Sequence, residues 1–255
     1  MNENFENLIE KFKVIARKRW IKGVTKGYGN VGLTFENELG KKIDTNYTPD
    51  YKNIEIKSTT RFSRFPISLF SIALDGPTDK EIIRLNETYG KNDKDFPDKK
   101  ILFEKIKVNE QQESNKNYLF SFLIKENKLY LQIYDKNKNL IEQEAYIYLD
   151  NIKKHVLTKL NNFAIIKASK KKIDGIEYFR YYQITLYTLK SFKIFIDLLQ
   201  KGKIEIFLVS RMQKSGTYVG RYRNKNLVFQ IKKQNISELF NQIYTYNYDD
   251  KNNQN

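Results

Sequence analysis

The chain has 255 residues, with 46 Lys or Arg against 30 Asp or Glu, so its formal net charge at pH 7 is +16. It has no cysteine and one histidine, which excludes disulfides, thiolate catalysis, cysteine-based zinc sites and multi-histidine metal centres. The charge favours a polyanionic partner such as a nucleic acid, although an AT-biased genome would also enrich a protein in lysine.

The distribution of apolar residues predicts the cellular location of the protein. The sequence contains no apolar run that approaches the ~20 residues needed to cross a bilayer. Its charged, amphipathic beginning, MNENFENLIEKFKV, lacks the apolar core of a signal peptide. We therefore expect a cytoplasmic protein that has no membrane partner.

The first third of the chain alternates helical and extended patterns. Apolar residues at helical spacing predict a helix over residues 4–20, with Trp20 at its end and in the core. After a glycine-rich, basic connection, Thr34 is expected to cap a helix that carries Glu36 and ends at Gly40. Three extended segments are expected next, over residues 47–51, 54–59 and 65–74.

The rest of the chain is predicted to form strands with a few helices. Residues 91–100 are predicted to be a solvated loop. Strands are expected over residues 118–124, 128–134, 145–149, 163–168, 178–186, 204–212 and 227–231, and helices over residues 151–160, 189–200 and 236–244. This order predicts an α/β or α+β fold with a mixed sheet, in which the order of the strands cannot be read from the sequence.

Three acids and a lysine suggest a metal-dependent phosphodiesterase. Asp50 follows a proline, and Glu55 and Lys57 flank Ile56 in a short apolar run. Side chains alternate along a strand, so Glu55 and Lys57 point to one face while Ile56 points into the core. Carboxylates that can hold Mg²⁺, beside an ammonium group, are the minimal set for hydrolysing a phosphodiester.

The short pattern is weak by itself. Glu55 and Lys57 could equally form a solvent-facing ion pair on an edge strand. In a similar string, Asp98 is followed distantly by Glu126 and Lys128, but this second pair lies in a polar turn between two predicted strands, where Asp98 could not share an ion with it. The apolar context of Glu55 distinguishes the first pattern, because a buried acid and lysine cost free energy unless they are paired or bind a metal.

Several spaced elements around these residues resemble the MutH-like nucleases, and most of all the MvaI/BcnI restriction endonucleases. The resemblance covers the first and last thirds of the chain. It rests on Gly32-x-Thr34-x-Glu36-x-x-Leu39-Gly40, Pro49-Asp50, Ile54 to Ser58, Ile67 to Phe70, Phe179 to Tyr181, Ile204 to Met212, Arg223 to Ile231 and Leu239-Phe240. It implies a PD-(D/E)xK restriction-endonuclease-like core with a mixed sheet and two lobes that form a DNA-binding cleft. The catalytic lobe would span residues 1–115 and the DNA-recognition lobe residues 116–255, with interleaving left open.

The resemblance also implies a mechanism. Asp50, Glu55 and the Ile56 carbonyl would bind Mg²⁺, or Mn²⁺ in its place; Lys57 would act on the attacking water; and Glu36 would complete the acidic cluster. The expected function is that of a type II restriction endonuclease, a monomer that hydrolyses double-stranded DNA to 5′-phosphate ends. A cognate DNA methyltransferase would be its partner in the same system.

Sequence recognition is expected in the C-terminal region, because Arg can pair with guanine and Asn with adenine. The candidates are Arg211, Arg221, Arg223, Asn224, Lys225 and Asn226. Family members usually carry Asn-His-Gly at residues 224–226 and a basic residue at Gln230, so the recognised sequence is expected to differ. Each arginine could instead contact phosphate or solvent.

Other functions stay open at this point. A MutH-like mismatch-repair nickase would use the same chemistry but leave plasmid as an open circle. A DNA-binding protein without catalysis would keep the acids as surface charge, although the intact Asp50, Glu55 and Lys57 argue against it. An RNA- or ribosome-binding protein is suggested by charge alone.

Overall fold

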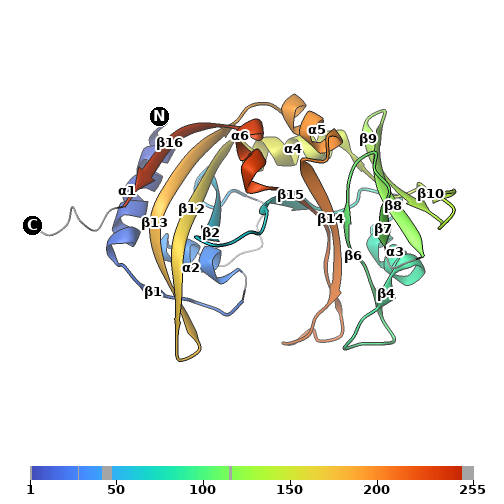
Figure 1. Cartoon of the computed structure of the whole chain (residues 1–255), viewed down its shortest axis with the longest axis horizontal. Coiled ribbons are helices and arrows are strands. Elements are labelled where there is room, and N and C mark those ends of the chain that lie inside the picture. The colour runs from blue at the N-terminus through green and yellow to red at the C-terminus, as the bar shows by residue number, and fades with distance from the viewer. Residues whose placement is uncertain (1, 28, 42–47, 115–116, 249–255) are drawn as a thin grey trace, which may run out of the picture. The chain divides into compact units, whose positions relative to one another are not determined.

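The computed structural model describes residues 2–27, 29–41, 48–114 and 117–248, without the side chains of residues 114 and 224–226. The chain forms two compact units that interleave along the sequence (Figure 1). Unit 1 contains Met1–Phe65, Leu157–Ser191 and Ile236–Asn255, and unit 2 contains Pro66–Val156 and Phe192–Asn235. These boundaries differ from a single division at residue 115.

Unit 1 is a mixed sheet covered on one face by two helices. The strand order is β1-β13-β12-β2, with β16 also paired to β13, and β2 runs parallel to β12. Its elements are α1 (Glu3–Arg17), β1 (Ile21–Lys22), α2 (Asn30–Glu38), β2 (Glu55–Thr60), the end of α4 (Leu149–Leu160), β12 (Asn162–Ile173), β13 (Ile176–Leu189), α6 (Ile236–Leu239) and β16 (Phe240–Asn247).

The core of unit 1 explains why these elements form. The side chain of Asn2 accepts a hydrogen bond from the Phe5 amide, which caps α1, and Phe5, Leu8 and Phe12 then recur on one buried face. This face packs with α2 on the side of the sheet that carries Ile56. The opposite face of the sheet is therefore left to Glu55 and Lys57.

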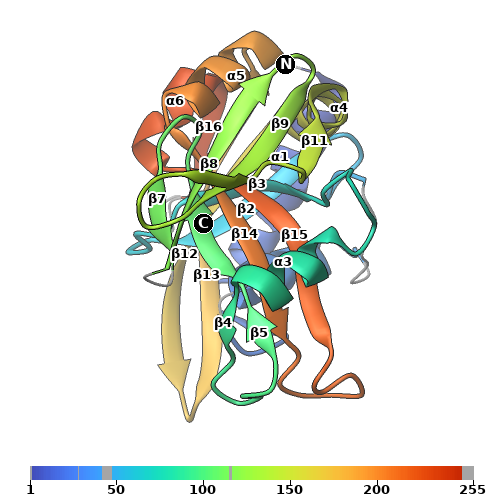
Figure 2. The same cartoon turned by 90° about the vertical axis from the view of Figure 1, so that its right-hand side faces the viewer.

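Unit 2 contains two larger sheets and a two-stranded one. The strand orders are β10-β9-β8-β7, with β11 on β9, then β3-β15-β14-β6, and β4-β5 (Figure 2). Its elements are β3 (Ile67–Ile72), α3 (Glu81–Tyr89), β4 (Lys91–Asn92), β5 (Lys100–Ile101), β6 (Phe103–Ile106), β7 (Gln112–Ser114), β8 (Tyr118–Lys125), β9 (Lys128–Tyr134), β10 (Leu140–Glu142), β11 (Tyr146–Tyr148), most of α4, α5 (Phe192–Gln200), β14 (Ile204–Met212), β15 (Tyr222–Ile231) and the 3-10 helix η1 (Lys233–Asn235).

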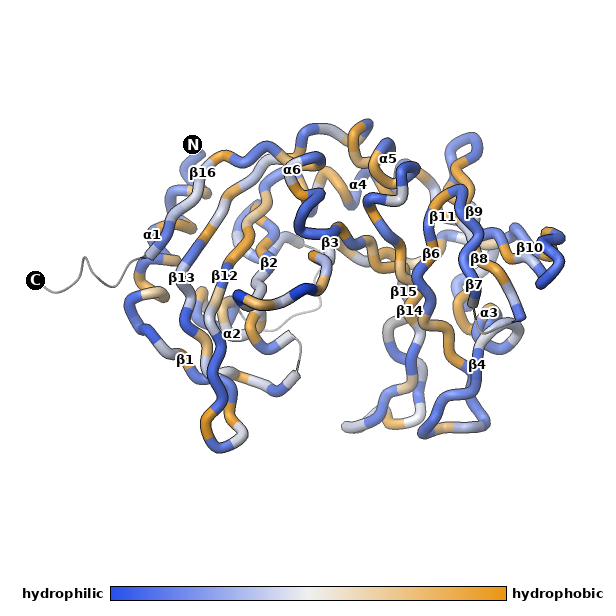
Figure 3. The backbone as a smooth tube through the Cα atoms, in the orientation of Figure 1, coloured by the Kyte–Doolittle hydropathy of each residue, from blue (hydrophilic) through white to orange (hydrophobic). Residues whose placement is uncertain are grey.

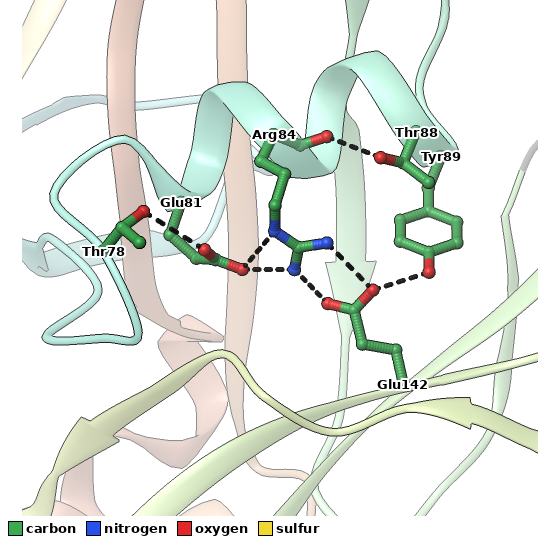
Figure 4. A network of polar contacts seen from close by, with 6 residues as sticks. All are labelled: Thr78, Glu81, Arg84, Thr88, Tyr89 and Glu142. Carbon is green, nitrogen blue, oxygen red and sulfur yellow. Dashed lines mark hydrogen bonds and ion pairs between the residues drawn. The ribbon is translucent and has the colours of Figure 1, made fainter.

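An ion-pair network joins α3 to β10 within unit 2 (Figure 4). The Arg84 guanidinium donates to the carboxylates of Glu81 and Glu142, and the Tyr89 hydroxyl donates to Glu142 Oε2 at 2.6 Å. The side chain of Glu81 is 1% exposed and that of Glu142 is 9% exposed. Arg84 thus neutralises two buried acids that come from distant parts of the chain.

The mixed α+β fold with mixed sheets is confirmed, and most of the predicted strands are present. The last predicted helix is wrong beyond its first turn. α6 ends at Leu239, and Phe240–Asn247 forms β16 on the edge of β13. The apolar residues there also fit a helix, but pairing with β13 satisfies backbone groups of both strands.

Four smaller expectations also fail. The second helix begins at Asn30 rather than at Thr34, whose hydroxyl lies inside α2 and donates to Asn30 Oδ1. Trp20 is half-buried rather than in the core. Residues 91–100 are not only a loop, since β4 and β5 pair across them. The strand predicted over residues 47–51 is also wrong: residue 47 lies outside the described part of the chain, and residues 48–51 form only an isolated bridge from Tyr51 to Ile54.

No helix in the described ranges combines the length and apolarity needed to cross a membrane.

Candidate active site

The edge strand β2 separates the reactive side chains from the core. Glu55 and Ile56 are both buried, 4% and 3% exposed, but they lie on opposite faces. Ile56 packs in the core of unit 1, whereas the Lys57 ammonium donates to Glu55 Oε1 on the other face. The predicted alternation around Ile56 is therefore present.

Asp50 is held beside this strand by the backbone of Ile56, whose amide donates to Asp50 Oδ2 at 2.9 Å. In a strand, the N–H and C=O of one residue point to the same side. β2 ends the sheet, with β12 on its other side, so the Ile56 carbonyl also points to the edge where Asp50 lies. The structure thus gathers two carboxylates and one carbonyl oxygen at this edge.

Two further lysines reach the same carboxylates. The Lys41 ammonium donates to Asp50 Oδ1 at 2.8 Å. Lys159, near the end of α4, donates to Glu55 Oε2 at 2.9 Å and to the Thr48 carbonyl at 2.6 Å. The sequence analysis missed both lysines, because nothing distinguishes them among 46 Lys or Arg residues. Lys159 is in addition 104 positions from its partner Glu55.

The helix α2 brings Glu36 close enough to Asp50, Glu55 and Lys57 to feel their charges, and two hydrogen bonds fix the position of the helix. Asn30, at its start, donates to Glu177 Oε2 on β13 at 2.7 Å. The Tyr181 hydroxyl donates to the Val31 carbonyl at 2.8 Å. A glycine is required at position 23, since a Cβ there would lie 2.5 Å from Nδ2 of the Asn30 side chain.

The site shifts the pKa values of Glu36 and Asp50 in opposite directions. Burial raises the pKa of Glu36, and the negative charges of Asp50 and Glu55 raise it further against the opposing lysines. Burial also acts to raise the pKa of Asp50, but Lys57, Lys41 and the Ile56 amide outweigh it and lower the pKa. Asp50 therefore stays ionised at a pH where Glu36 has begun to take up a proton.

The comparisons with known proteins agree with this geometry. The MvaI/BcnI restriction endonuclease family matches residues 9–240. The chain belongs to this family. Among solved structures, it is similar to the "Restriction endonuclease MvaI-cognate DNA substrate complex", with a TM-score of 0.88, 25% identity and coverage of 95% of this chain and 98% of that one. It is also similar to "Restriction endonuclease MvaI in the absence of DNA", with a TM-score of 0.59, 23% identity and the same coverage. The search of curated proteins found no match.

Membership of the MvaI/BcnI family confirms the expected resemblance and function class. The protein is a type II restriction endonuclease, a site-specific deoxyribonuclease. Its matched range, residues 9–240, includes the three acids, Lys57 and the predicted recognition strands.

The predicted base-reading residues lie on the hairpin of β14 and β15 in unit 2. Arg211 is the cross-strand partner of Arg223, and both are exposed. The Arg211 guanidinium lies 3.9 Å from the centre of the Phe103 ring, and that of Arg221 lies 5.3 Å from the Tyr218 ring. The side chains of Asn224, Lys225 and Asn226 lie outside the described part, although their backbone belongs to β15.

The oxygen donors at the edge of β2 suit a hard divalent cation. Asp50 and Glu55 supply carboxylates and Ile56 a carbonyl, the donor types that Mg²⁺ and Mn²⁺ prefer. Among the described residues, no three His, Asp or Glu side chains are gathered tightly enough to hold an ion by themselves. A site that fits these residues is therefore one in which the Ile56 carbonyl or water completes the coordination.

Proposed function

We propose that this restriction endonuclease hydrolyses double-stranded DNA at Asp50, Glu55 and Lys57, with Mg²⁺ as cofactor and 5′-phosphate ends as products. The observation that carries the proposal is the shared edge of β2, where Asp50 binds the Ile56 amide and Lys57 binds Glu55. The similar MvaI structure is described as a complex with cognate DNA substrate, which supports duplex DNA as the substrate here.

Each residue has a role that follows from its charge and position. Asp50, Glu55 and the Ile56 carbonyl would hold Mg²⁺, or Mn²⁺ in its place. When bound, the metal supplies Lewis-acid stabilisation of the charge that develops on the phosphate. Lys57 orients the attacking water or helps to deprotonate it, and offsets negative charge in the transition state. Glu36 completes the cluster as the acid that takes up a proton first.

We further propose that the β14–β15 hairpin reads the DNA sequence. Two like charges directly opposite each other on a hairpin are unfavourable, and Arg211 and Arg223 occupy such positions. An anion or a guanine edge between them would remove this repulsion. Stacking on Phe103 pre-orders Arg211 for this contact. Arg221 and residues 224–226 would extend the same reading surface.

The remaining parts of the proposal concern the cellular setting. We expect a cytoplasmic monomer that cuts one strand at a time, with residues 1–115 contributing the cutting site and residues 116–255 the reading strands. A cognate DNA methyltransferase would protect the host sites.

Two substitutions test the assignment of the site. Asp50→Ala and Lys57→Ala are expected to lower cleavage in Mg²⁺ by at least ~10³-fold, because each removes a group on which the chemistry depends. Binding of cognate duplex, measured without divalent metal by fluorescence anisotropy, should stay within a few-fold of the unmodified protein.

A matched control is Lys18→Ala, which removes a surface lysine paired with Glu38 on α2. It should cleave normally. Near-normal cleavage by Asp50→Ala or Lys57→Ala in Mg²⁺ would contradict the proposed site.

A further inference from the structure

The turn that follows the catalytic strand exposes two aromatic rings between two arginines. Phe62 is 86% exposed and Phe65 is 65% exposed, and Arg61 and Arg64 are exposed beside them. Two exposed rings in one turn, rimmed by charged residues, form an apolar patch of the kind that is typical of interaction surfaces. The charge of this turn favours an anionic partner.

The turn is a defined structure that is fixed to the sheet. The Ser63 amide donates to the Thr60 carbonyl at 3.0 Å, and the Arg61 amide donates to the Ala168 carbonyl of β12 at 2.9 Å. The Arg61 guanidinium lies 5.6 Å from the centre of the Phe62 ring. Cation and ring are therefore presented together, at the end of the strand that carries Glu55 and Lys57.

A lysine-rich hairpin continues this surface. β12 and β13 extend beyond the end of β2, and the lysine run of β12 is strongly hydrophilic (Figure 3). Thr59 is the register partner of Lys167, so Lys167 shares the face of Lys57 one strand away. Further along this face, the Lys171 ammonium lies 4.4 Å from the Trp20 ring and 5.9 Å from that of Tyr178.

The lysines of β12 extend the positive charge well beyond the level of Lys57. Ile165 is the register partner of Lys57. At about 3.3 Å per residue, Lys167 lies roughly 7 Å and Lys171 roughly 20 Å beyond that level along β12.

The acid of β13 nearest the lysine run points away from Lys171. Glu177, the acid of β13 nearest the lysine run, accepts from Asn30 Nδ2 and from Lys170 Nζ at 3.1 Å. Both contacts lie toward α2, on the face opposite Lys171. Glu177 thus pairs with Lys170 rather than with Lys171, which is half-buried beside Trp20, while Lys167 is exposed on the catalytic face.

We propose that Arg61, Phe62, Arg64, Lys167 and Lys171 form a flanking-DNA surface, which binds the duplex beside the scissile phosphate without reading its sequence. The proposal rests on duplex DNA as the substrate. The arginines and lysines would neutralise phosphates, and Phe62 would contact sugars or bases in the groove. This surface belongs to unit 1 and is separate from the β14–β15 reading hairpin.

The test compares the salt dependence of duplex binding. A random-sequence duplex of about 30 base pairs is titrated in EDTA at several salt concentrations, because each phosphate contact contributes about 0.9 to the slope of log K against log salt. Arg61→Ala/Arg64→Ala should flatten this slope by roughly 2 and weaken binding by about 10-fold or more near 0.1 M salt. Phe62→Ala should weaken binding by roughly 5-fold or more without changing the slope, because it removes no charge.

The control is Lys11→Ala/Arg17→Ala on α1, which removes the same charge from the helical side of the sheet. Its slope should stay close to that of the unmodified protein. A slope for Arg61→Ala/Arg64→Ala equal to that of the unmodified protein would overturn the proposal, and so would equal losses in the control. The proposed function is judged separately, by whether the unmodified protein cleaves DNA in Mg²⁺.

Discussion

Glu36 and Asp50 show how single residues are poised in the site. A raised pKa means that the folded protein disfavours ionised Glu36, so folding gains stability as the pH falls through that raised value. Asp50 behaves oppositely. Its lowered pKa contributes stability above the ordinary range of an aspartate, and this is lost as the pH falls through the lowered value.

We therefore expect Glu36→Gln to stabilise the protein while weakening cleavage. Removing a buried negative charge should raise the melting temperature at pH 7 by roughly 1–3 °C. Cleavage in Mg²⁺ should fall by about 10-fold or more as the acidic cluster loses a charge. Thermal melts at several pH values check the cause, since the gain should shrink once the pH falls below the raised pKa of Glu36.

Glu38→Gln is the matched control on the same helix, because Glu38 is paired with Lys18. It should not raise the melting temperature. A Glu36→Gln variant that is less stable at pH 7 would contradict the account of its buried charge.

At the residue scale, the sequence predicted which faces Glu55, Ile56 and Lys57 occupy, because strand alternation is a local rule. The structure also brings Asp50 and Glu36 to them, as expected. Lys41 and Lys159 could not be found, since both resemble many solvated lysines and Lys159 meets Glu55 only through the fold. Base reading by Arg211 and its neighbours stays a prediction.

Helices and strands, like single residues, could be predicted where their signal is local and not where it comes from distant parts of the chain. β8 and β9 were predicted because their apolar alternation and short connecting turn are local signals, and Glu126 of the similar acidic string sits in that turn with φ 55°. α3 was missed although Ile82, Leu85 and Tyr89 recur on its buried face at helical spacing. β16 was taken for a helix because only the free edge of β13 makes it a strand.

The Arg84 network predicts that α3 and β10 depend on one side chain. Arg84→Met would leave the buried carboxylates of Glu81 and Glu142 without their cation. We expect a loss of about 2–3 kcal/mol in the free energy of unfolding, below the usual figure for a fully buried pair because the Arg84 side chain is 39% exposed. Urea denaturation followed by circular dichroism measures this loss.

Lys214→Met provides the comparison, because its pair with Asp95 is exposed on both sides. It should leave the urea midpoint unchanged. An Arg84→Met midpoint equal to that of the unmodified protein would mean that the network is not a structural requirement of unit 2.

At the scale of the whole molecule, the net charge of +16 and the two interleaved units suit a protein that binds DNA through several patches. Unit 1 holds the residues proposed to cut and the flanking-DNA surface, and unit 2 holds those proposed to read. A restriction endonuclease both recognises and cleaves DNA, so membership of the MvaI/BcnI family accounts for both activities in one chain. The sequence predicted the nuclease class from the spaced motif, whereas the interleaving of the units depends on how distant segments pair.

The central claim is tested most directly by digesting unmethylated genomic DNA with the protein in Mg²⁺ and sequencing the fragment ends. We predict discrete fragments whose 5′-phosphate ends share one short sequence, linear rather than open-circular product from plasmids carrying it, and no product with Lys57→Ala. Absence of Mg²⁺-dependent cleavage, or equal cleavage by Lys57→Ala, would contradict the account.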